Sequence, residues 1–472
     1  MTRFIYPVIT LLLFIFAPEG FSKPICIACA VIFAMHFFRV IRIDMLHTKD
    51  GLLSFNFLFA LSAFAVLYVF PVFLYGTSLD YSFRHLSIFH ESAVNKVTAL
   101  STFGYSIYLI SYEHYLTTSL KKATYTTVEA RVSDASLFFS KLLSVLCVIA
   151  FTVNIIFFMS IIDSTHNDLT VNTYIAELTK CFLTVCLLFC AEKYKDQIKN
   201  NVKLFFLHAK LPIICFIIVM LEYLYIGDRG FVIVGGLTLL FAYVHYVKKI
   251  NSIILIPAAI VAIVFMSLVG QLRKSDASLR EGGLSSFSTA SNDIIGSTSG
   301  LDMLEYISDL TLVSNVAFLE WDYASSNYLY KPERVLVLLS MPIPMAPSLL
   351  ASVMYNDNVA STSTGYIVTN YYNSQVTYAG DGGLGTQMIM DLYMSWRIVG
   401  VIIGMWLLGL LLGKANAFKD DNIYYLTLLI TFFGLAIYLP RSTIYACFRT
   451  IVWEILFIYT IAKVQKTRIR RH

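Results

Sequence analysis

Long uncharged apolar runs are the feature of this sequence that most restricts its fold. A helix needs about 20 apolar residues to cross the hydrocarbon layer of a bilayer, and only 14% of the 472 residues are charged. Ordinary soluble domains carry about 25% charged residues, so a soluble globular enzyme is excluded. The sequence predicts an all-α, polytopic integral membrane protein with about twelve spans, at residues 4–17, 24–38, 52–75, 97–112, 135–162, 174–191, 211–226, 230–247, 252–270, 391–413, 422–438 and 443–462.

The first run, 4–17, also resembles the apolar part of a cleaved signal peptide. The residues that follow it, 17–20, read Ala-Pro-Glu-Gly, which is a poor small-residue cleavage site, and a second apolar run begins at once. We therefore expect the first helix to be retained.

Lysine and arginine are distributed unequally between alternate connections. With a cytoplasmic N-terminus, 21 basic residues fall in the inner connections and ends, and five fall in the short outer connections. Short loops rich in Lys and Arg are held on the cytoplasmic side. The sequence therefore predicts that both termini are cytoplasmic. The net charge of +5 is too weak to indicate a nucleic-acid partner.

One connection is far longer than the others. Residues 271–390 separate the ninth and tenth predicted spans and face outward in this topology. Connections of this length are usually functional or folded. We therefore divide the chain into a membrane region of nine helices (1–270), a large periplasmic loop (271–390), and a membrane region of three helices with a basic tail (391–472).

Two apolar patterns lie within the large loop. Apolar residues recur at helical spacing over 303–313, which predicts an amphipathic helix against the membrane or the other helices. The run 335–354 is apolar but contains Pro342, Pro344 and Pro347. Prolines interrupt helices, so we expect a re-entrant or interfacial segment here instead of another span.

Tyrosines are frequent toward the end of the large loop, and Tyr371 and Tyr372 are adjacent. A tyrosine ring offers a flat apolar face with a hydroxyl at its edge, which suits contact with a sugar. Tyrosines also gather at the headgroup level of membranes. Both interpretations stay open from the sequence alone.

Arg229 lies in a tight predicted outer turn, 227–230, with a glycine at each end. Glycines let a phosphate approach the backbone, and a guanidinium binds phosphate through two hydrogen bonds. The alternative is a local ion pair with Asp228. Glu222, two turns earlier on the same helix, could orient a neighbouring cation.

Further arginines are predicted near the outer face. Arg441 lies in the last outer turn, and the final helix is expected to carry Tyr445, Arg449 and Trp453 on one stripe at four-residue steps. Arg449 could bind a ligand or pair with Glu454 or another helix. Together the arginines suit a dianionic, membrane-linked group such as a lipid pyrophosphate. The remaining members of this outer set are Arg273 and Arg280 after the ninth span, and Arg397 with Asp391 in the tenth.

Metal and cofactor motifs are scarce. The sequence lacks nucleotide-loop and zinc-protease motifs, and all eight cysteines lie in apolar runs. Glu320 and Asp322 form the one acid-x-acid pair in the outward loop, but such a spacing is frequent by chance. We predict neither a metal nor a cofactor.

Two short patterns accompany this layout of many spans, cytoplasmic ends and one late outer loop. The first is a Gly-x-Arg turn, and the second is a glycine-rich exit from the large loop into an acid-x-Tyr helix punctuated by glycines. The matching residues are Gly227, Asp228 and Arg229, then Gly383, Leu384, Gly385, Thr386, Asp391, Leu392 and Tyr393, then Gly400, Val401, Leu408 and Gly409. In layout and patterns the chain resembles the Wzy-type O-antigen, or oligosaccharide repeat-unit, polymerases. It departs from them at Asp391, where Glu is more usual, and at Arg397.

The resemblance implies a GT-C-like, metal-independent and inverting glycosyltransferase of the bacterial inner membrane. Its donor and acceptor would be oligosaccharides linked to undecaprenyl pyrophosphate, and a chain-length regulator protein would be a further partner. Arg280 and Asp391 are then the expected catalytic residues, with Asp381 and Glu320 as rivals for the proton-accepting carboxylate. The expected substrate-binding residues are Arg229, Arg273, Arg397, Arg441, Arg449, Tyr371 and Tyr372.

Two other functions share parts of this layout. The related O-antigen ligases usually have an important histidine in the large loop, and residues 271–390 contain no histidine. A transporter or lipid flippase matches the number of spans, but it would more naturally have similar halves and charges deep in the bundle.

Overall fold

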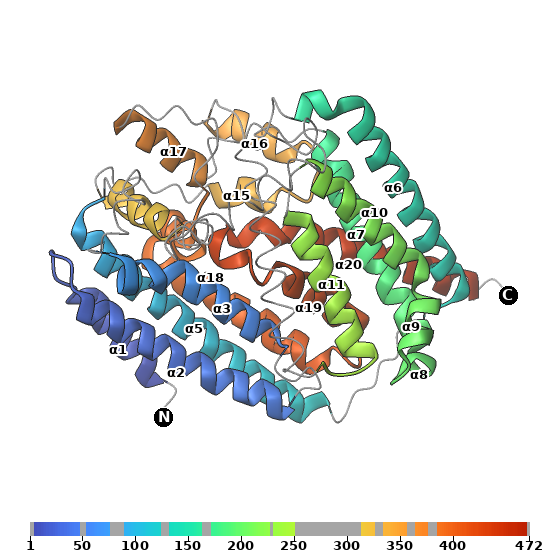
Figure 1. The fold of residues 1–472 in the computed structure, drawn as a ribbon, viewed down its shortest axis with the longest axis horizontal. Coiled ribbons are helices and arrows are strands. Elements are labelled where there is room, and N and C mark those ends of the chain that lie inside the picture. Colours follow the sequence, from blue (N-terminus) through green and yellow to red (C-terminus); the bar gives the residue numbers. More distant parts are fainter. Residues whose placement is uncertain are drawn as a thin grey trace, which may run out of the picture.

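The computed structural model describes residues 4–47, 53–75, 89–123, 132–162, 171–226, 230–250, 313–325, 334–355, 364–375 and 385–469. Secondary structure in these ranges is entirely helical, and the long helices form one bundle (Figure 1). The bundle helices are α1 (Ile5–Ile15), α2 (Lys23–His47), α3 (Phe55–Tyr68) continued by the π-helix η2 (Val69–Leu74), α5 (Glu91–Ala123), α6 (Asp134–Ile162), α7 (Val171–Lys193), α8 (Lys195–Ile198), α9 (Val202–His208), α10 (Lys210–Ile226), α11 (Gly230–Tyr246), α18 (Met388–Phe418), α19 (Ile423–Leu435) and α20 (Phe448–Ile469).

Helices occupy the predicted spans wherever these fall in the described residues, and the run 252–270 lies outside them. Within the part of the chain that the structure describes, five helical stretches are long and apolar enough to cross a membrane, and α9 with α10, bent by 77°, would be a sixth. Helices α1, α11 and α19 are apolar but shorter. The chain is therefore a helical protein with several apolar candidate spans, and the number twelve stays a prediction.

An exposed apolar stripe on α6 shows how the bundle meets its surroundings. Phe138, Leu142, Leu146, Ile149 and Val153 are all exposed, and they recur every three or four residues. A soluble protein would bury such a stripe, whereas acyl chains solvate it. The pattern agrees with a multi-pass membrane protein.

Helix α5 lies at the opposite side of the bundle and is covered by α1, α2 and α18 (Figure 1). Its contact with α18 is very close. A Cβ added at Gly409 would lie 2.5 Å from the carbonyl oxygen of Tyr108, and one at Gly413 would lie 2.7 Å from that of Tyr112. Small residues four apart let helix backbones touch in membranes. These two glycines therefore set the α5–α18 contact.

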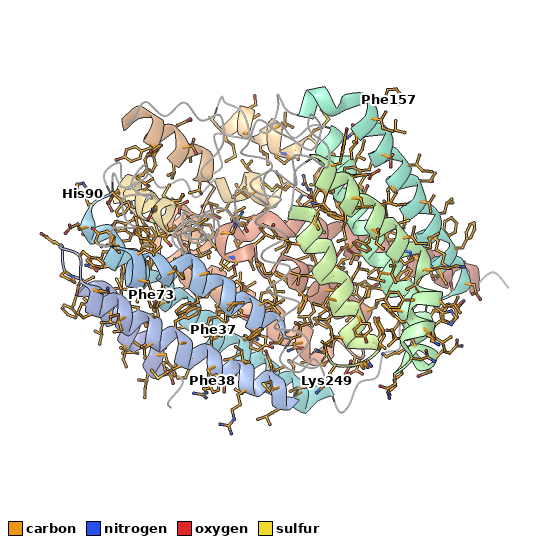
Figure 2. The ribbon with its side chains drawn as sticks, in the orientation of Figure 1. Phe37, Phe38, Phe73, His90, Phe157 and Lys249 are labelled. Atoms are coloured by element: carbon orange, nitrogen blue, oxygen red, sulfur yellow. The ribbon has the colours of Figure 1, made fainter. Side chains whose placement is uncertain are left out.

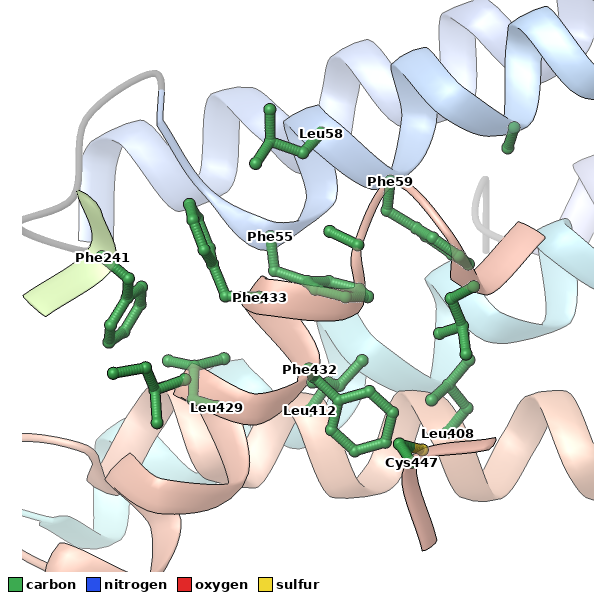
Figure 3. Packing of buried hydrophobic residues seen from close by; sticks show 14 of the residues in the cluster. Phe55, Leu58, Phe59, Phe241, Leu408, Leu412, Leu429, Phe432, Phe433 and Cys447 are labelled. Atoms are coloured by element: carbon green, nitrogen blue, oxygen red, sulfur yellow. The ribbon is translucent and has the colours of Figure 1, made fainter. Parts of the chain in front are cut away.

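Aromatic side chains fill the space between α3, α11, α18 and α19 (Figure 3). Phe55 of α3 contacts Phe432 edge-on at 6.2 Å between ring centroids, and Phe241 of α11 contacts Phe433 at 5.0 Å. This core joins the two sides of the bundle.

The described parts of the large loop gather at one end of the bundle. They are residues 313–325, α15 (Arg334–Leu339), α16 (Ala346–Tyr355) and α17 (Thr364–Gln375) (Figure 1). Figure 2 shows His90 and Phe157 toward this end and Lys249 at the opposite end. We call the end with the loop helices the loop end.

The proline-rich run 335–354 is broken into α15 and α16, which confirms that it does not form one continuous span. Its turn is fixed to the bundle at two points. The Trp453 indole N–H donates to the carbonyl oxygen of Pro342 at 2.7 Å, and the backbone N–H of Met345 donates to the Tyr174 hydroxyl at 3.3 Å.

Two helices differ from the predicted pattern. Helix α18 starts at Met388, and its helical dihedral angles are interrupted at Trp396 and Arg397, so the predicted span 391–413 is not one straight helix. The final helix starts only at Phe448, because residues Ile444–Cys447 form the 3₁₀ helix η6. The prediction that Tyr445 shares an α-helical stripe with Arg449 is therefore wrong.

Candidate functional site

Several short segments meet at the loop end of α18. They are the helix 313–325, the start of α17, and the 3₁₀ helices η5 (Leu439–Arg441) and η6. Two buried carboxylates, Asp391 and Glu320, hold these segments together. We call this group of contacts the carboxylate junction.

Asp391 is the centre of the junction and is only 1% exposed. Its Oδ1 accepts a hydrogen bond from the Thr364 hydroxyl at 2.5 Å, and its Oδ2 accepts one from the Thr443 hydroxyl at 2.7 Å. It lies in the first turn of α18, where the helix dipole favours a negative charge. Asp391 therefore links α18 to α17 and to the turn before α20.

Glu320 forms the second half of the junction and is fully buried. It accepts hydrogen bonds from the Thr386 hydroxyl and, at 3.4 Å, from the backbone N–H of Gln387. These partners directly precede α18, so Glu320 fixes the segment that carries Asp391. A buried carboxylate is costly unless such donors satisfy it.

Asp322, two residues further on, faces a different partner. Its Oδ2 accepts the backbone N–H of His90 at 2.5 Å. Burial raises the pKa of this carboxyl from 3.8 to about 6. Because Glu320 and Asp322 contact separate segments, the acid-x-acid pair does not converge on one point. Within the described ranges, no three His, Cys, Asp or Glu side chains come together as metal ligands.

Two glycines allow the close approach of the loop to the bundle. A Cβ on Gly365, next to Thr364, would lie 2.6 Å from the carbonyl oxygen of Gly385. Gly385 has a φ of +81°, which side chains other than glycine rarely adopt. The glycine-rich exit from the loop thus has a local structural cause.

Arg441 is brought toward the junction by Thr443, which lies two residues after it and donates to Asp391. The Arg441 guanidinium lies 5.2 Å from the ring centroid of Tyr438, and the side chain is partly exposed. Asp391 and Arg441, 50 residues apart in the chain and both predicted as site residues, therefore lie on segments that contact each other.

Arg449 occupies a separate ionic cluster, between α20 and α7. Its Nη2 lies 3.5 Å from Glu177 Oε1, and its guanidinium lies over the rings of Tyr174 and Trp453. Lys180 pairs with the same Glu177 oxygen at 3.0 Å. The partner of Arg449 is thus on another helix, while Glu454 accepts a hydrogen bond from Thr431 instead.

Sequence reasoning missed Glu177 and Lys180. Their signal was available, because two opposite charges three residues apart inside an apolar run mark a functional or paired site. Glu222 was expected to orient a cation, and the structure shows a 2.6 Å hydrogen bond to it from the Thr152 hydroxyl of α6.

The two predicted tyrosines have different surroundings. Tyr372 is 1% exposed and packs with Val316, Leu319 and Val368. Tyr371 is partly exposed, and its ring lies edge-on to Tyr323 at 5.1 Å. Only Tyr371 of the two could offer a ring face to a sugar in this arrangement. Arg229, Arg273, Arg280 and Asp381 lie outside the described residues.

Arg397 lies at the break of α18, with φ 52° and ψ −146°. Its guanidinium is 5.4 Å from the Tyr393 ring centroid, and Nη1 is 3.5 Å from the Tyr393 hydroxyl. This backbone conformation is strained for a residue with a side chain. Such outliers concentrate at functional sites, so the break is a candidate site of its own beside the carboxylate junction.

Comparisons with known proteins add one finding. A family model described as O-antigen polysaccharide polymerase Wzy matches residues 2–471, nearly the whole chain. No curated protein and no solved structure matches the chain.

Proposed function

The chain belongs to the O-antigen polysaccharide polymerase Wzy family, and we propose that it joins repeat units carried on a polyprenyl pyrophosphate at the loop end of the bundle. Membership makes it a glycosyltransferase-type polymerase that acts on lipid-linked oligosaccharide repeat units. The face of the membrane, the donor's pyrophosphate and the residues that act are our proposal.

The observation that carries the proposal is the contact between the Asp391 and Arg441 segments through Thr443. Glycosyl transfer from a pyrophosphate needs a carboxylate that accepts a proton and a cation that stabilises the leaving group. The acceptor hydroxyl forms a bond to the anomeric carbon, and the bond from that carbon to the pyrophosphate oxygen breaks. The hydroxyl proton passes to the Asp391 carboxylate, while the electron pair leaves with the pyrophosphate toward Arg441.

Attack from the side opposite the pyrophosphate inverts the anomeric carbon, and the guanidinium supplies the positive charge, as the family resemblance implies for a metal-independent reaction. The step requires that Thr443 release Asp391 Oδ2 when the acceptor binds. Thr443 lies on a short turn between η5 and η6, where little regular structure opposes this movement. Arg229, Arg273 and Arg280 remain proposed phosphate ligands.

The distribution of charge supports a periplasmic loop end and cytoplasmic termini. The described loop helices lie opposite the end that carries Lys249 (Figure 2), and basic connections are retained on the cytoplasmic side. We therefore propose a location in the bacterial inner membrane with the carboxylate junction facing the periplasm.

Deletion of the gene in its source bacterium tests the class of function. Loss of a polymerase is expected to leave surface glycan capped with a single repeat unit, visible as the collapse of a ladder on a polysaccharide gel. Loss of a ligase would leave no glycan attached, and loss of a flippase would trap repeat units inside; either result would overturn the proposal. Complementation with the wild-type gene is the control and should restore the ladder.

A further inference from the structure

An open pocket of about 460 Å³ lies beside the break of α18. It is lined by Phe14 of α1, Ala324 and Ser325 of the helix 313–325, and Tyr393, Arg397 and Ile398 of α18. It is distinct from the carboxylate junction, whose acids are not among its lining residues. None of these lining residues takes part in the proposed transfer step.

Two aromatic rings, Phe14 and Tyr393, form part of the pocket wall and are held in place from behind. Trp321 stacks on Tyr393 at 5.1 Å, and Phe14 meets Trp321 edge-on at 5.7 Å. Lys96 donates to the carbonyl oxygens of Phe14 at 2.9 Å and Ile15 at 3.2 Å, which fixes the end of α1. The rings therefore form a prearranged apolar surface.

Arg397 is the one charged group among the described residues that line this pocket. Among the described residues it has no carboxylate partner, in contrast to Arg39, which pairs with Glu113 at 3.1 Å, and to Arg449. A cation beside an apolar surface is expensive without an anion. Charge complementarity therefore favours an anionic ligand.

The strained backbone keeps Arg397 at the pocket. At the break, α18 bends so that Leu392 lies over Gly404, where an added Cβ would come within 2.6 Å of Leu392 Cδ2. Gly400 similarly admits the carbonyl oxygen of Leu392, at 2.4 Å from an added Cβ. The bend thus places a residue of strained backbone, Arg397, in the pocket lining.

Exposed apolar side chains follow the pocket along α18. Ile402, one turn after the lining residue Ile398, is exposed, as are Val399 and Ile403. A free sugar would need several hydrogen-bonding partners, and this wall offers few. An amphiphile with an anionic head fits both features, because its chain can follow the exposed apolar side chains of α18 into the bilayer while its head reaches Arg397.

We propose that this pocket binds the isoprenoid phosphate end of one lipid-linked substrate, with Arg397 on the phosphate and the Phe14, Tyr393 and Ile398 side chains on the first isoprene groups. The inference rests on the proposed function for the identity of the lipid. It assigns a lateral entry from the outer leaflet between α1 and α18. Bilayer phospholipids share the same chemistry, so the test must separate the two sources.

The test is photolabelling of the purified full-length chain in neutral detergent with a benzophenone analogue of farnesyl pyrophosphate. Labelling is expected at residues of the pocket segments and should fall at least fivefold in Arg397→Gln, with partial recovery in Arg397→Lys. Arg42→Gln, which removes an exposed arginine from α2, is the matched control and should label as wild type. Elution as a single peak in size-exclusion chromatography shows that each variant is folded.

Competition identifies the ligand. Farnesyl pyrophosphate should abolish labelling, whereas inorganic pyrophosphate and phosphatidylglycerol at equal concentration should compete at least tenfold less well. Unchanged labelling in Arg397→Gln, or equal competition by either of these two compounds, would overturn the proposal. Binding needs no turnover, so its failure is distinct from a failure of the polymerase function, which the gene deletion tests separately.

Discussion

The two ends of α18 each carry a buried aspartate contact, but they are built differently. At the end away from the loop, Asp44 of α2 accepts hydrogen bonds from Tyr112 at 2.6 Å, Asn56 at 2.7 Å and Asn416 at 3.4 Å. All of these partners lie on long regular helices. At the loop end, Asp391 accepts hydrogen bonds from threonines of a short loop helix and of a turn, and the break in α18 begins five residues later, at Trp396.

From this difference we interpret the Asp44 contact as part of the scaffold and the Asp391 contact as part of the functional site. Regular helices and touching glycines hold the Asp44 contact, so its removal should affect folding. Short segments hold the Asp391 contact, and such segments can move without unfolding the bundle. Comparable burial of two carboxylates thus serves stability at one end and, in our proposal, chemistry at the other.

The largest expected effect comes from forcing α5 and α18 apart. Gly409→Leu puts a side chain where the Tyr108 carbonyl already lies. Overpacking usually lowers the free energy of unfolding by about 1–3 kcal/mol, and the loss should be larger here because the backbone must move. We expect loss of the monodisperse peak in detergent size-exclusion chromatography. Gly236→Leu on α11 is the control, since a Cβ there meets nothing within 4 Å. Equal wild-type yields of both variants would refute the scaffold role.

The next effect compares the two aspartates directly. Asp44→Ala leaves the Tyr112 and Asn56 donors without this acceptor, and each buried unsatisfied donor costs about 1–3 kcal/mol. Asn416 loses its weaker bond but still donates to the Tyr112 hydroxyl at 2.6 Å. Asp391→Asn keeps the shape and can still exchange hydrogen bonds with Thr364 and Thr443. Thermal unfolding in detergent should show a much larger fall in Tm for Asp44→Ala. A larger fall for Asp391→Asn would reverse the comparison.

A smaller effect is expected from pH at the loop end. Asp322 ionises near pH 6 in the folded chain and near 3.8 when unfolded. The folded state therefore holds its proton more tightly, and stability falls as pH rises from about 4 to 6, then stays level. The Tm of wild type relative to Asp322→Asn should follow this course. A constant difference between pH 4 and 8 would show that Asp322 has an ordinary pKa.

The smallest effect concerns the strain at the break. Glycine accepts the dihedral angles of residue 397, so Arg397→Gly should raise the free energy of unfolding by about 1 kcal/mol and raise the Tm slightly. The same variant should lose lipid labelling, because the guanidinium is gone. Arg397→Ala should lose labelling without the gain in Tm. Identical Tm values for the two variants would mean that the bend stores no strain.

The helices were largely predictable from the sequence, because apolar runs of membrane length have few alternatives to helix. The break of α18 was not, because residues 396–397 are Trp and Arg, without a proline or glycine to mark it. At the break, Gly400 and Gly404 admit Leu392 from within the same helix, a contact that only the folded chain reveals.

The candidate site was predictable in its charges and not in its contacts. Asp391 and Arg441 were found as ionisable residues near the outer ends of apolar runs. Their hydroxyl partners were not, since Thr364 and Thr443 lie 27 and 52 residues from Asp391 and threonine is common in helices and loops. Tyr372 was selected for a ring face that packing against Val368 and its neighbours covers.

The most direct measurement of the central claim is polymerisation by the purified chain in liposomes supplied with its lipid-linked repeat unit. Mass spectrometry should detect a two-unit product and one released lipid pyrophosphate for each bond formed. Asp391→Asn should lower this rate at least a hundredfold, while Thr364→Val, which removes a hydrogen bond and keeps the carboxylate, should lower it far less. Product formation at the wild-type rate by folded Asp391→Asn would contradict the account.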